Sequence, residues 1–260
     1  GIDVRGYFIE RRAEGVLDPL EVNVLALACG ENKAVVLSID ACGTNKPADL
    51  ALRSAITEAT GLPADKILLC ATHTHSTPDL YMTDIPAIPR YRKLLQEKCA
   101  EAAVAALADR KTAAFAIGSM DTDRLNFIKH YKQANGNFVG DNFGNEKESP
   151  IVEHVSKVYS KMHVIKITRE GCKDLVVCNF RSHPTLTGGT NKLEVSSDFV
   201  GPMRDSVEKQ KDCDFVFFQG ACGNINPRSR IKEENVSEDW KHHGKRAANY
   251  VVKAEKTYQE

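Results

Sequence analysis

The sequence predicts an α/β fold in which a mixed β-sheet forms the core and helices flank it in layers. Short apolar runs typical of strands alternate along the chain with longer segments of helical periodicity. Some of the expected strands follow each other across a tight turn, as in a β-hairpin. Because hairpins interrupt the alternation of strands and helices, the pattern favours a mixed sheet over a strictly parallel one.

The first half of the chain supplies a hairpin, two helices and two further strands. The first helix has Pro47 in its first turn and stops at Gly61, which is followed by a proline. The second helix, over about 91–109, carries a stripe of leucine, alanine and cysteine. A Gly-Glu-Asn-Lys turn joins the strands of the hairpin. The expected strands cover residues 22–28, 34–39, 67–71 and 113–117.

The second half begins with a long polar segment. Residues 121–155 are rich in asparagine and glycine and have no clear periodicity, which predicts a loop. A loop of that length in a compact domain is usually functional or mobile, and the alternative is the edge of a second module. Regular structure then resumes. The expected strands cover 163–168, 175–180 and 215–218, and the expected helices cover about 200–209 and 238–255.

Composition limits the partners and the location of the protein. With 35 basic and 35 acidic side chains in 260 residues, neither nucleic acid nor an anionic membrane surface is an expected partner. No stretch approaches the roughly 18 apolar residues of a transmembrane segment. The eight cysteines contain no Cys-x-x-Cys pair, which argues against a zinc ribbon. Without a secretory signal pattern, they predict free thiols in a reducing compartment and a cytoplasmic protein.

Polar residues follow four of the expected strands at their carboxyl ends. Asp40 follows the strand 34–39, and longer polar segments cover 72–79, 182–192 and 219–229. Ligand sites in α/β sheets favour such strand ends, because loops converge there over a rigid scaffold. We therefore expect the four segments to form one site.

Histidines are the main candidates for metal ligands. His73 and His75 are two residues apart, so in an extended segment both imidazoles point to one side and can bind one ion such as zinc. The alternative is a surface loop in which they only form hydrogen bonds. His183 is a further candidate for a metal ligand, because it follows the carboxyl end of an expected strand. His242 and His243 lie on an expected helix, where a surface pair is the simplest interpretation.

Taken in order, the polar segments resemble those of the neutral, non-lysosomal ceramidase family. The matching segments are His73-Thr-His-Ser-Thr-Pro78, His183-Pro-Thr185, Ser196-Ser-Asp-Phe-Val-Gly201 and Phe218-Gln-Gly-Ala-Cys-Gly-Asn-Ile-Asn-Pro227. Asp18-Pro19-Leu20 and Leu37-Ser-Ile-Asp40 also resemble the opening strands of that family. The similarity runs over nearly the whole chain. It implies a single ceramidase-like catalytic domain over residues 1–260, open to truncation at both ends.

The resemblance implies a hydrolase that uses one zinc ion to cleave the amide bond of N-acylated sphingoid bases. It implies that His73 and His183 bind the zinc and that His75 lies beside it, in a substrate-binding or proton-handling role. A zinc site normally has three protein ligands and a water. The further ligands of the family lie beyond the matched segments. Either the chain is a fragment, or Asp40, His75 or another carboxylate completes the site.

Departures from the family affect the nucleophile and the substrate. Asn226 stands at the position of a serine in the family, and an amide cannot act as a nucleophile. Water activated by the metal is then the expected nucleophile, with Asn226 or Asn224 holding the substrate or an oxyanion. The Gly-Pro-Gly-Gly after the first motif is replaced by Thr77-Pro-Asp-Leu80, so a typical long-chain ceramide is not the expected substrate.

Two further residues are expected at the substrate. Arg124 resembles an arginine of the family and is expected to pair with a carboxylate or phosphate of the substrate. The alternative is a solvated arginine in a loop. Asp40 is expected at the substrate because it follows the carboxyl end of the strand 34–39. The leading hypothesis is a zinc-dependent hydrolase of an amide, or less readily an ester, in a small or lipid-like substrate. The alternatives are a metal hydrolase of another substrate class and a catalytically inactive ceramidase-like protein that binds a metal or a ligand.

Overall fold

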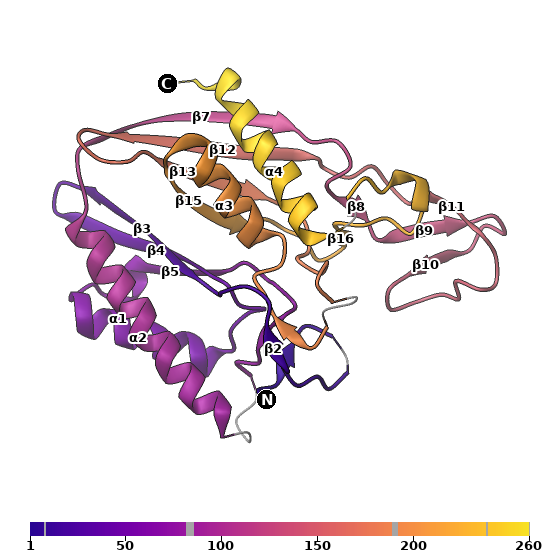
Figure 1. Ribbon diagram of the computed structural model, residues 1–260, viewed down its shortest axis with the longest axis horizontal. Helices are drawn as coiled ribbons and strands as arrows, with labels where there is room; N and C mark the ends of the chain where they lie inside the picture. Colours follow the sequence, from indigo (N-terminus) through magenta and orange to yellow (C-terminus); the bar gives the residue numbers. More distant parts are fainter. Residues whose placement is uncertain (8, 82–85, 189–191, 238, 260) are drawn as a thin grey trace.

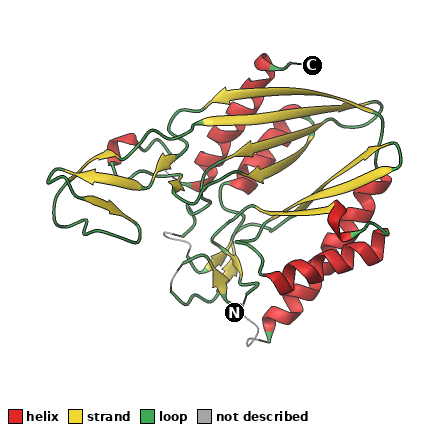
Figure 2. Cartoon of the chain, turned by 180° about the vertical axis from the view of Figure 1, so that it is seen from behind, coloured by secondary structure: helices red, strands yellow, loops and turns green. Residues whose placement is uncertain are grey.

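The structure, a computed structural model, describes residues 1–7, 9–81, 86–188, 192–237 and 239–259. Its core consists of two mixed sheets, and each sheet carries a pair of helices on one face (Figures 1 and 2). The predicted layered α/β fold is confirmed, with the difference that the sheet is divided into two. Among the described residues, no helix combines the length and the apolar character that a membrane span requires.

The first sheet contains β3 (Val22–Cys29), β4 (Asn32–Ile39) and β5 (Ile67–Ala71) in that order. β3 and β4 form the predicted antiparallel hairpin, and β5 is parallel to β4. The crossover between β4 and β5 is α1 (Lys46–Thr60), which packs beside α2 (Ala87–Ala108). The second helix begins four residues earlier than predicted.

Local interactions explain where α1 begins and ends. The side chain of Asn45 accepts a hydrogen bond from the backbone nitrogen of Ala48 at 3.0 Å, which satisfies a free donor of the first turn. Gly61 follows the last turn with a φ of 72°, in the left-handed region that glycine adopts without strain. Both ends were therefore predictable from single residues.

The second sheet contains four strands in the order β15, β13, β12, β7. β12 is antiparallel to both β7 and β13, whereas β13 and β15 are parallel. The crossover between the parallel pair includes α3 (Val200–Lys211), which packs against α4 (Trp240–Ala254). The strands are β7 (Ala113–Asp121), β12 (Lys161–Arg169), β13 (Leu175–Phe180) and β15 (Asp214–Gln219).

The prediction of a loop over residues 121–155 is wrong, because the segment contains four short strands. β9, β10 and β11 form a small sheet in the order β10-β9-β11, and β8 pairs with β16. Strands of two to four residues are too short to establish a period-two pattern, so no sequence signal indicates them. Their bounds are β8 (Phe127–Ile128), β9 (His130–Gln133), β10 (Phe138–Gly140), β11 (Ile151–His154) and β16 (Ile225–Asn226).

The remaining elements are short and connect distant parts of the chain. β1 pairs with β6, and β2 pairs with β14, so the N-terminal residues lie against both histidine segments. Three 3-10 turns complete the structure. The bounds are β1 (Val4–Arg5), β2 (Gly15–Val16), β6 (Thr77–Pro78), β14 (Glu194–Val195), and residues Ala64–Lys66, Lys232–Glu234 and Glu255–Thr257 for the turns.

Each sheet has its own hydrophobic core with its helices, and the two sheets meet along β15. The hydroxyl of Ser38 on β4 donates to the carbonyl of Phe217 on β15 at 2.5 Å. Beyond this contact the sheets diverge, and a cleft of about 920 Å³ lies between them, lined by β3 and by strands of the second sheet. The contact with β15 brings the carboxyl end of β5 towards those of β13 and β15.

The prediction of a surface pair at 242 and 243 is half wrong. His242 is exposed, but His243 is fully buried against Phe199, with 5.1 Å between the ring centroids. Position 243 lies four and eight residues before the buried Ala247 and Val251, on the inner face of α4. Glu238, the predicted first residue of this helix, lies outside the described residues.

His243 makes the stability of the fold sensitive to acid. Burial, with the nearby Arg246, lowers the pKa of His243 to about 3. Between its ordinary pKa near 6.5 and about 3, the unfolded chain binds a proton that the folded chain does not, so stability falls as the pH falls. His243→Asn keeps a donor for Ser237 without titrating. Between pH 3 and 6.5, the free energy of unfolding of His243→Asn should therefore change less with pH, by about 1.4 kcal/mol per pH unit. Urea unfolding at several pH values measures this slope.

His242→Asn is the matched control for this prediction, because it changes an exposed histidine on the same helix. Its slope should equal that of the unchanged protein. An unchanged slope in His243→Asn would show that His243 does not contribute to the acid sensitivity.

Candidate functional site

The site forms where the carboxyl ends of β5, β13 and β15 meet. His73 and His75 follow β5, and His183 follows β13. The backbone nitrogen of His75 donates to the carbonyl of Pro184 at 3.0 Å, and that of His183 donates to the carbonyl of Ile225 at 3.1 Å. The three polar segments are therefore joined by backbone hydrogen bonds, as expected from their common position at strand ends.

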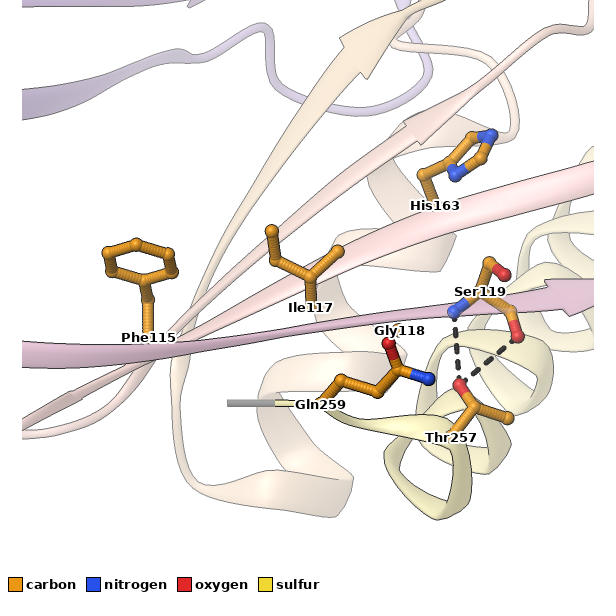
Figure 3. Close-up of a pocket in the computed structure, with 7 residues that line it drawn as sticks. All are labelled: Phe115, Ile117, Gly118, Ser119, His163, Thr257 and Gln259. Carbon is orange, nitrogen blue, oxygen red and sulfur yellow. Dashed lines mark hydrogen bonds between the residues drawn. The ribbon is translucent and has the colours of Figure 1, made fainter.

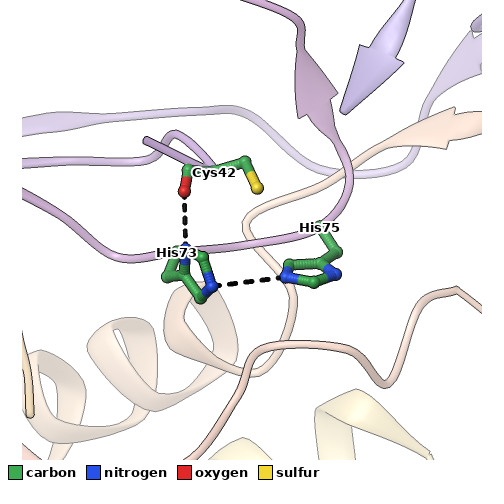
Figure 4. Close-up of side chains that lie close together, drawn as sticks. All are labelled: Cys42, His73 and His75. Carbon is green, nitrogen blue, oxygen red and sulfur yellow. Dashed lines mark hydrogen bonds between the residues drawn. The ribbon is translucent and has the colours of Figure 1, made fainter. Parts of the chain in front are cut away.

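The three imidazoles converge on one point through their Nε2 atoms. The Nε2 of His75 lies 3.1 Å from that of His183 and 3.4 Å from that of His73. The ring centroids are 4.6 to 5.0 Å apart. Two nitrogens that bind one tetrahedral zinc at about 2.0–2.1 Å are about 3.3 Å apart. His75 thus lies at such a distance from each of the other two imidazoles, and ligand nitrogens of His73 and His183 lie within 4.8 Å of each other, so all three surround one small region. Figure 4 shows His73 and His75 in this arrangement.

Carbonyl groups fix the tautomers of two of the histidines. The Nδ1 of His73 donates to the carbonyl of Cys42 at 2.6 Å, and the Nδ1 of His183 donates to the carbonyl of Cys222 at 2.9 Å (Figure 4 for His73). The Nε2 of each is then the unprotonated nitrogen, whose lone pair can accept a hydrogen bond or bind a metal. Histidines that bind metals almost always donate their other ring N–H to such a partner. His73 and His183 therefore fit the role of metal ligands predicted for them.

His75 differs from the other two histidines. Its Nδ1 is buried and has no hydrogen-bond partner among the described residues. Since His73 and His183 both present Nε2 acceptors, the Nε2 of His75 donates to one of them. The edge of the Tyr7 ring lies against its imidazole, with 5.3 Å between centroids. His75 therefore lacks the outer partner typical of a ligand, and its Nδ1 stays buried and unpaired within the described part of the chain.

At His75 and His183, burial is the largest influence on the pKa of the imidazole, and it favours the neutral form. Burial, with the neighbouring His183 and His73, lowers the pKa of His75 to about 2. Burial also lowers the pKa of His183 to about 4, although its bond to the carbonyl of Cys222 opposes this. Neutral imidazole is the form that binds a divalent cation.

The backbone around His73 and His75 is unusual. His73 has a φ of 68°, a left-handed conformation that non-glycine residues adopt at some energetic cost and that is enriched at functional sites. Gly6 approaches His75 so closely that an added Cβ would lie 2.4 Å from the Cβ of His75. The close approach fixes the position of the His75 side chain and requires glycine at position 6.

Gly6→Ala should therefore disturb the centre without removing a histidine. The added methyl group displaces His75, and the φ of 127° at Gly6 disfavours any side chain. We expect zinc affinity to fall about tenfold or more, as for other changes just outside a metal site, measured by calorimetric titration.

Gly136→Ala is the matched control for this change. It also has a positive φ, of 86°, but a Cβ added there would meet no atom within 4 Å. Equal zinc affinity in the two variants would contradict the role assigned to the contact between Gly6 and His75.

Arg11 anchors the histidine segment and was not predicted. Its side chain is buried and its guanidinium donates to the carbonyl of His75 at 2.6 Å and to that of Arg5 at 2.7 Å. A third bond, of 2.9 Å, joins it to the carbonyl of Lys192. The N-terminal residues have no periodicity or motif, so no sequence signal distinguished Arg11 from an exposed arginine.

Two aspartates tie the loops around the centre together. Both the backbone nitrogen and the hydroxyl of Thr187 donate to Asp198, at 2.7 and 2.9 Å, and that hydroxyl lies 2.8 Å from the hydroxyl of Ser76. Asp18 accepts from the hydroxyl of Ser196 at 2.5 Å. Burial raises the pKa of Asp198 to about 6. The matched segment 196–201 therefore positions the segments that carry the histidines. Residues 189–191 of the predicted polar segment lie outside the described residues.

Asp40 was expected at the substrate, but its side chain is occupied in the core. It is fully buried, its two oxygens lie 3.1 and 3.3 Å from a guanidinium nitrogen of Arg204, and it accepts from the backbone nitrogen of Glu21 at 3.0 Å. Arg204 also pairs with the carboxylate of Glu21 at 3.1 Å. These contacts give Asp40 a structural role, because its ion pair with Arg204 joins the two layers.

Arg124 lies in a cavity of about 550 Å³ whose lining includes His154 and Glu234 and none of the three central histidines. Its side chain is half-exposed and contacts the carboxylate of Asp123 at 3.3 Å. The structure therefore does not bring Arg124 into the histidine centre. Its role as an anion-binding residue stays a prediction.

Asn224 and Asn226 lie on the segment that passes His183. The carbonyl of Asn224 accepts from the backbone nitrogen of Lys129 at 2.9 Å, and Asn226 is half-buried in β16, where it pairs with Phe127. Their neighbour Ile225 accepts from the backbone of His183. The segment is thus fixed beside the centre, and the roles predicted for the two amides stay predictions.

Two thiols adjoin the centre and were not predicted as part of it. The sulfur of Cys42 and one ligand nitrogen each of His73 and His75 lie within 4.8 Å of one another, and so do the sulfur of Cys222 and nitrogens of His73 and His183. All eight cysteines are free thiols, as the sequence predicted. Burial raises the pKa of Cys42 and of Cys222 to about 11.

A separate hollow of about 600 Å³ lies on the edge of the second sheet, away from the strand ends (Figure 3). It forms where the C-terminal residues meet β7. The hydroxyl of Thr257 accepts from the backbone nitrogen of Ser119 at 3.0 Å and donates to its carbonyl at 3.1 Å (Figure 3). These bonds explain the hollow as a packing feature of the sheet edge.

Comparison with known proteins agrees with this geometry at the level of the fold. No protein family model and no curated protein sequence matches the chain. A solved structure described as a ceramidase complexed with C2 superimposes with a TM-score of 0.75 at 14% identity, covering 99% of this chain and 42% of that one. The neutral ceramidase from Pseudomonas aeruginosa gives 0.72 at 15% identity, covering 99% and 43%.

The chain spans less than half the length of these ceramidases. The resemblance that the ordered motifs indicated is confirmed by the similarity of the folds over nearly the whole chain. This chain therefore has the fold of these ceramidases, at a sequence identity of 14 to 15%.

Proposed function

We propose that the chain is a zinc-dependent hydrolase that cleaves an N-acyl amide bond, and that a typical long-chain ceramide is not its substrate. The observation that carries the proposal is the convergence of three imidazole Nε2 atoms, 3.1 and 3.4 Å apart, at the strand ends of a ceramidase fold. Two of these imidazoles have the carbonyl partners that metal ligands usually have. The donor set and its spacing fit zinc.

In this proposal, His73 and His183 hold the zinc through Nε2. Zinc in such a site supplies Lewis-acid polarisation of the amide carbonyl and a more acidic water. His75 binds substrate or moves a proton, since its Nε2 lies 3.1 and 3.4 Å from those of the two proposed ligands. Asn226 and Asn224 hold the carbonyl oxygen of the substrate. Water adds to the carbonyl carbon, the C–N bond breaks, and the leaving nitrogen takes up a proton.

A second candidate function is a ceramidase-like protein that binds a metal or ligand without turnover. Asn226 favours it, because the family has a serine at this position and an amide side chain cannot replace a nucleophile. Asp40 and Arg124 do not decide between the two functions. The first is engaged by Arg204, and the second lies in a different cavity.

An assay of amide hydrolysis separates the two candidates. The purified chain, loaded with zinc, is incubated with sphingosine amides that carry acetyl, medium or long acyl chains, and with matching esters. Release of the amine or alcohol is measured by mass spectrometry. We expect zinc-dependent release from the amides, faster for short acyl chains than for long ones.

His75→Ala should lower the rate of release while zinc stays bound, and His163→Ala, an exposed histidine on β12, should not. Zinc-bound protein that binds the amides and releases no amine would contradict the hydrolase and support the binding protein.

A further inference from the structure

The histidine centre includes sulfur as well as nitrogen donors. Two groups of three donors surround His73, one with Cys42 and His75 and the other with His183 and Cys222. Within the described part of the chain, neither group includes a carboxylate. A catalytic zinc site normally has three protein ligands and an open position for water. The sequence left Asp40, His75 or another carboxylate open as the third ligand, and the donors that the structure places beside His73 and His183 include a thiol.

We propose that the Sγ of Cys222 is the third protein ligand, which gives a site of two histidines and one cysteine. This inference shares one requirement with the proposed function, which is that a metal binds at the histidine centre. His73 and His183 supply nitrogen, Cys222 supplies a thiolate, and the fourth position stays open. The arrangement leaves His75 beside the metal with a role in proton transfer or substrate binding.

The geometry favours Cys222 over Cys42. The sulfur of Cys222 lies within 4.8 Å of nitrogens of both histidines that have carbonyl partners, whereas the group of Cys42 contains His73 and His75. The carbonyl of Cys222 accepts from the Nδ1 of His183 at 2.9 Å, so one residue fixes the orientation of that imidazole and also offers a sulfur to the same centre. The same carbonyl accepts from the backbone of Ile225 at 2.8 Å, which closes a tight turn around the thiol.

The surroundings of Cys222 suit a ligand. The residue is 8% exposed, so a bound metal would be protected from solvent on that side. When a cation binds, a metal–sulfur bond forms, the S–H bond breaks, and the proton passes to the buffer. A soft thiolate with two imidazoles selects zinc, cobalt or copper over magnesium, calcium or manganese.

X-ray absorption at the zinc edge tests the ligand set directly. In the zinc-loaded chain we expect one sulfur neighbour at about 2.3 Å together with nitrogen or oxygen neighbours at about 2.0–2.1 Å. Cys222→Ser should lose the sulfur neighbour, and Cys42→Ser, the matched variant on the other side of His73, should keep it. Circular dichroism establishes that each variant is folded.

Cobalt substitution gives a second readout that does not depend on hydrolysis. The Co²⁺-loaded chain should show a near-ultraviolet sulfur-to-metal charge-transfer band, which Cys222→Ser abolishes and Cys42→Ser retains. Cys222→His should restore zinc affinity without the band, because imidazole replaces the thiolate. If Cys222→Ser does not fold, the spectra of the unchanged protein and of Cys42→Ser still decide the question.

The outcomes separate this inference from the proposed function. Bound zinc with only nitrogen and oxygen neighbours in the unchanged protein would overturn the thiolate ligand and leave the hydrolase intact. Loss of the sulfur signal in Cys42→Ser would overturn the assignment to Cys222. Failure of the unchanged protein to bind zinc would overturn both.

Discussion

Replacing His183 or His73 with alanine is expected to abolish hydrolysis, because each change removes a nitrogen from a centre with few donors. The carbonyls of Cys222 and Cys42 orient these imidazoles, so the Nε2 atoms are pre-positioned for a metal. Changes outside a metal site cost about 10–100-fold in affinity, and the loss of a ligand should cost more than about 100-fold. Calorimetric titration with zinc and the amide assay measure the two effects.

His163→Ala is the control for both variants, because it removes an exposed histidine on β12. It should bind zinc and turn over substrate as the unchanged protein does. Full hydrolysis by folded His183→Ala would refute the assignment of His183 to the metal.

Arg204→Met is expected to destabilise the fold by about 3–5 kcal/mol, since it leaves a carboxylate buried without its cation. Arg204 is buried, and it pairs with Asp40, whose side chain is fully buried, and with the partly exposed Glu21. Burial raises the pKa of Asp40, and Arg204 opposes that rise. Urea unfolding measures the loss. Arg12→Met, which removes an exposed arginine paired with Asp3 and Glu10, should cost at most about 1 kcal/mol.

The double variant Asp40→Asn/Arg204→Met isolates the pair. Because both charges are removed together, its loss should be smaller than the sum of the two single losses. Additive losses would show that the two side chains do not interact. The variant Asp40→Asn also tests whether Asp40 binds substrate, since a structural role changes the free energy of unfolding and leaves the KM of folded protein unchanged.

Elements with clear periodicity and punctuation were predictable, and elements fixed by tertiary contacts were not. The ends of α1 follow from Asn45, Pro47 and Gly61, whose preferences act locally. The division of the core into two sheets depends instead on β15 meeting β3, β4 and β5, which no local pattern encodes. Within 121–155, β9, β10 and β11 pair with one another and β8 pairs with the distant β16, but strands this short show no period-two pattern.

The candidate site shows the same contrast. His73, His75 and His183 could be grouped from sequence, because each follows an apolar strand and the ends of such strands meet. Asp40 satisfied the same rule, yet its side chain points to Arg204 and not to the histidines. Cys222 lies in the matched segment 218–227, but single cysteines usually act as small hydrophobes. Only the positions of the nitrogens around it indicate a ligand.

Metal content of the purified chain, determined by elemental analysis after incubation with zinc and removal of unbound ions, tests the central claim most directly. The account predicts about one zinc per chain, retained by His163→Ala and lost by His73→Ala and His183→Ala. A folded, unchanged protein that retains no zinc, or one that retains it equally in all three variants, would contradict a metal centre at these histidines.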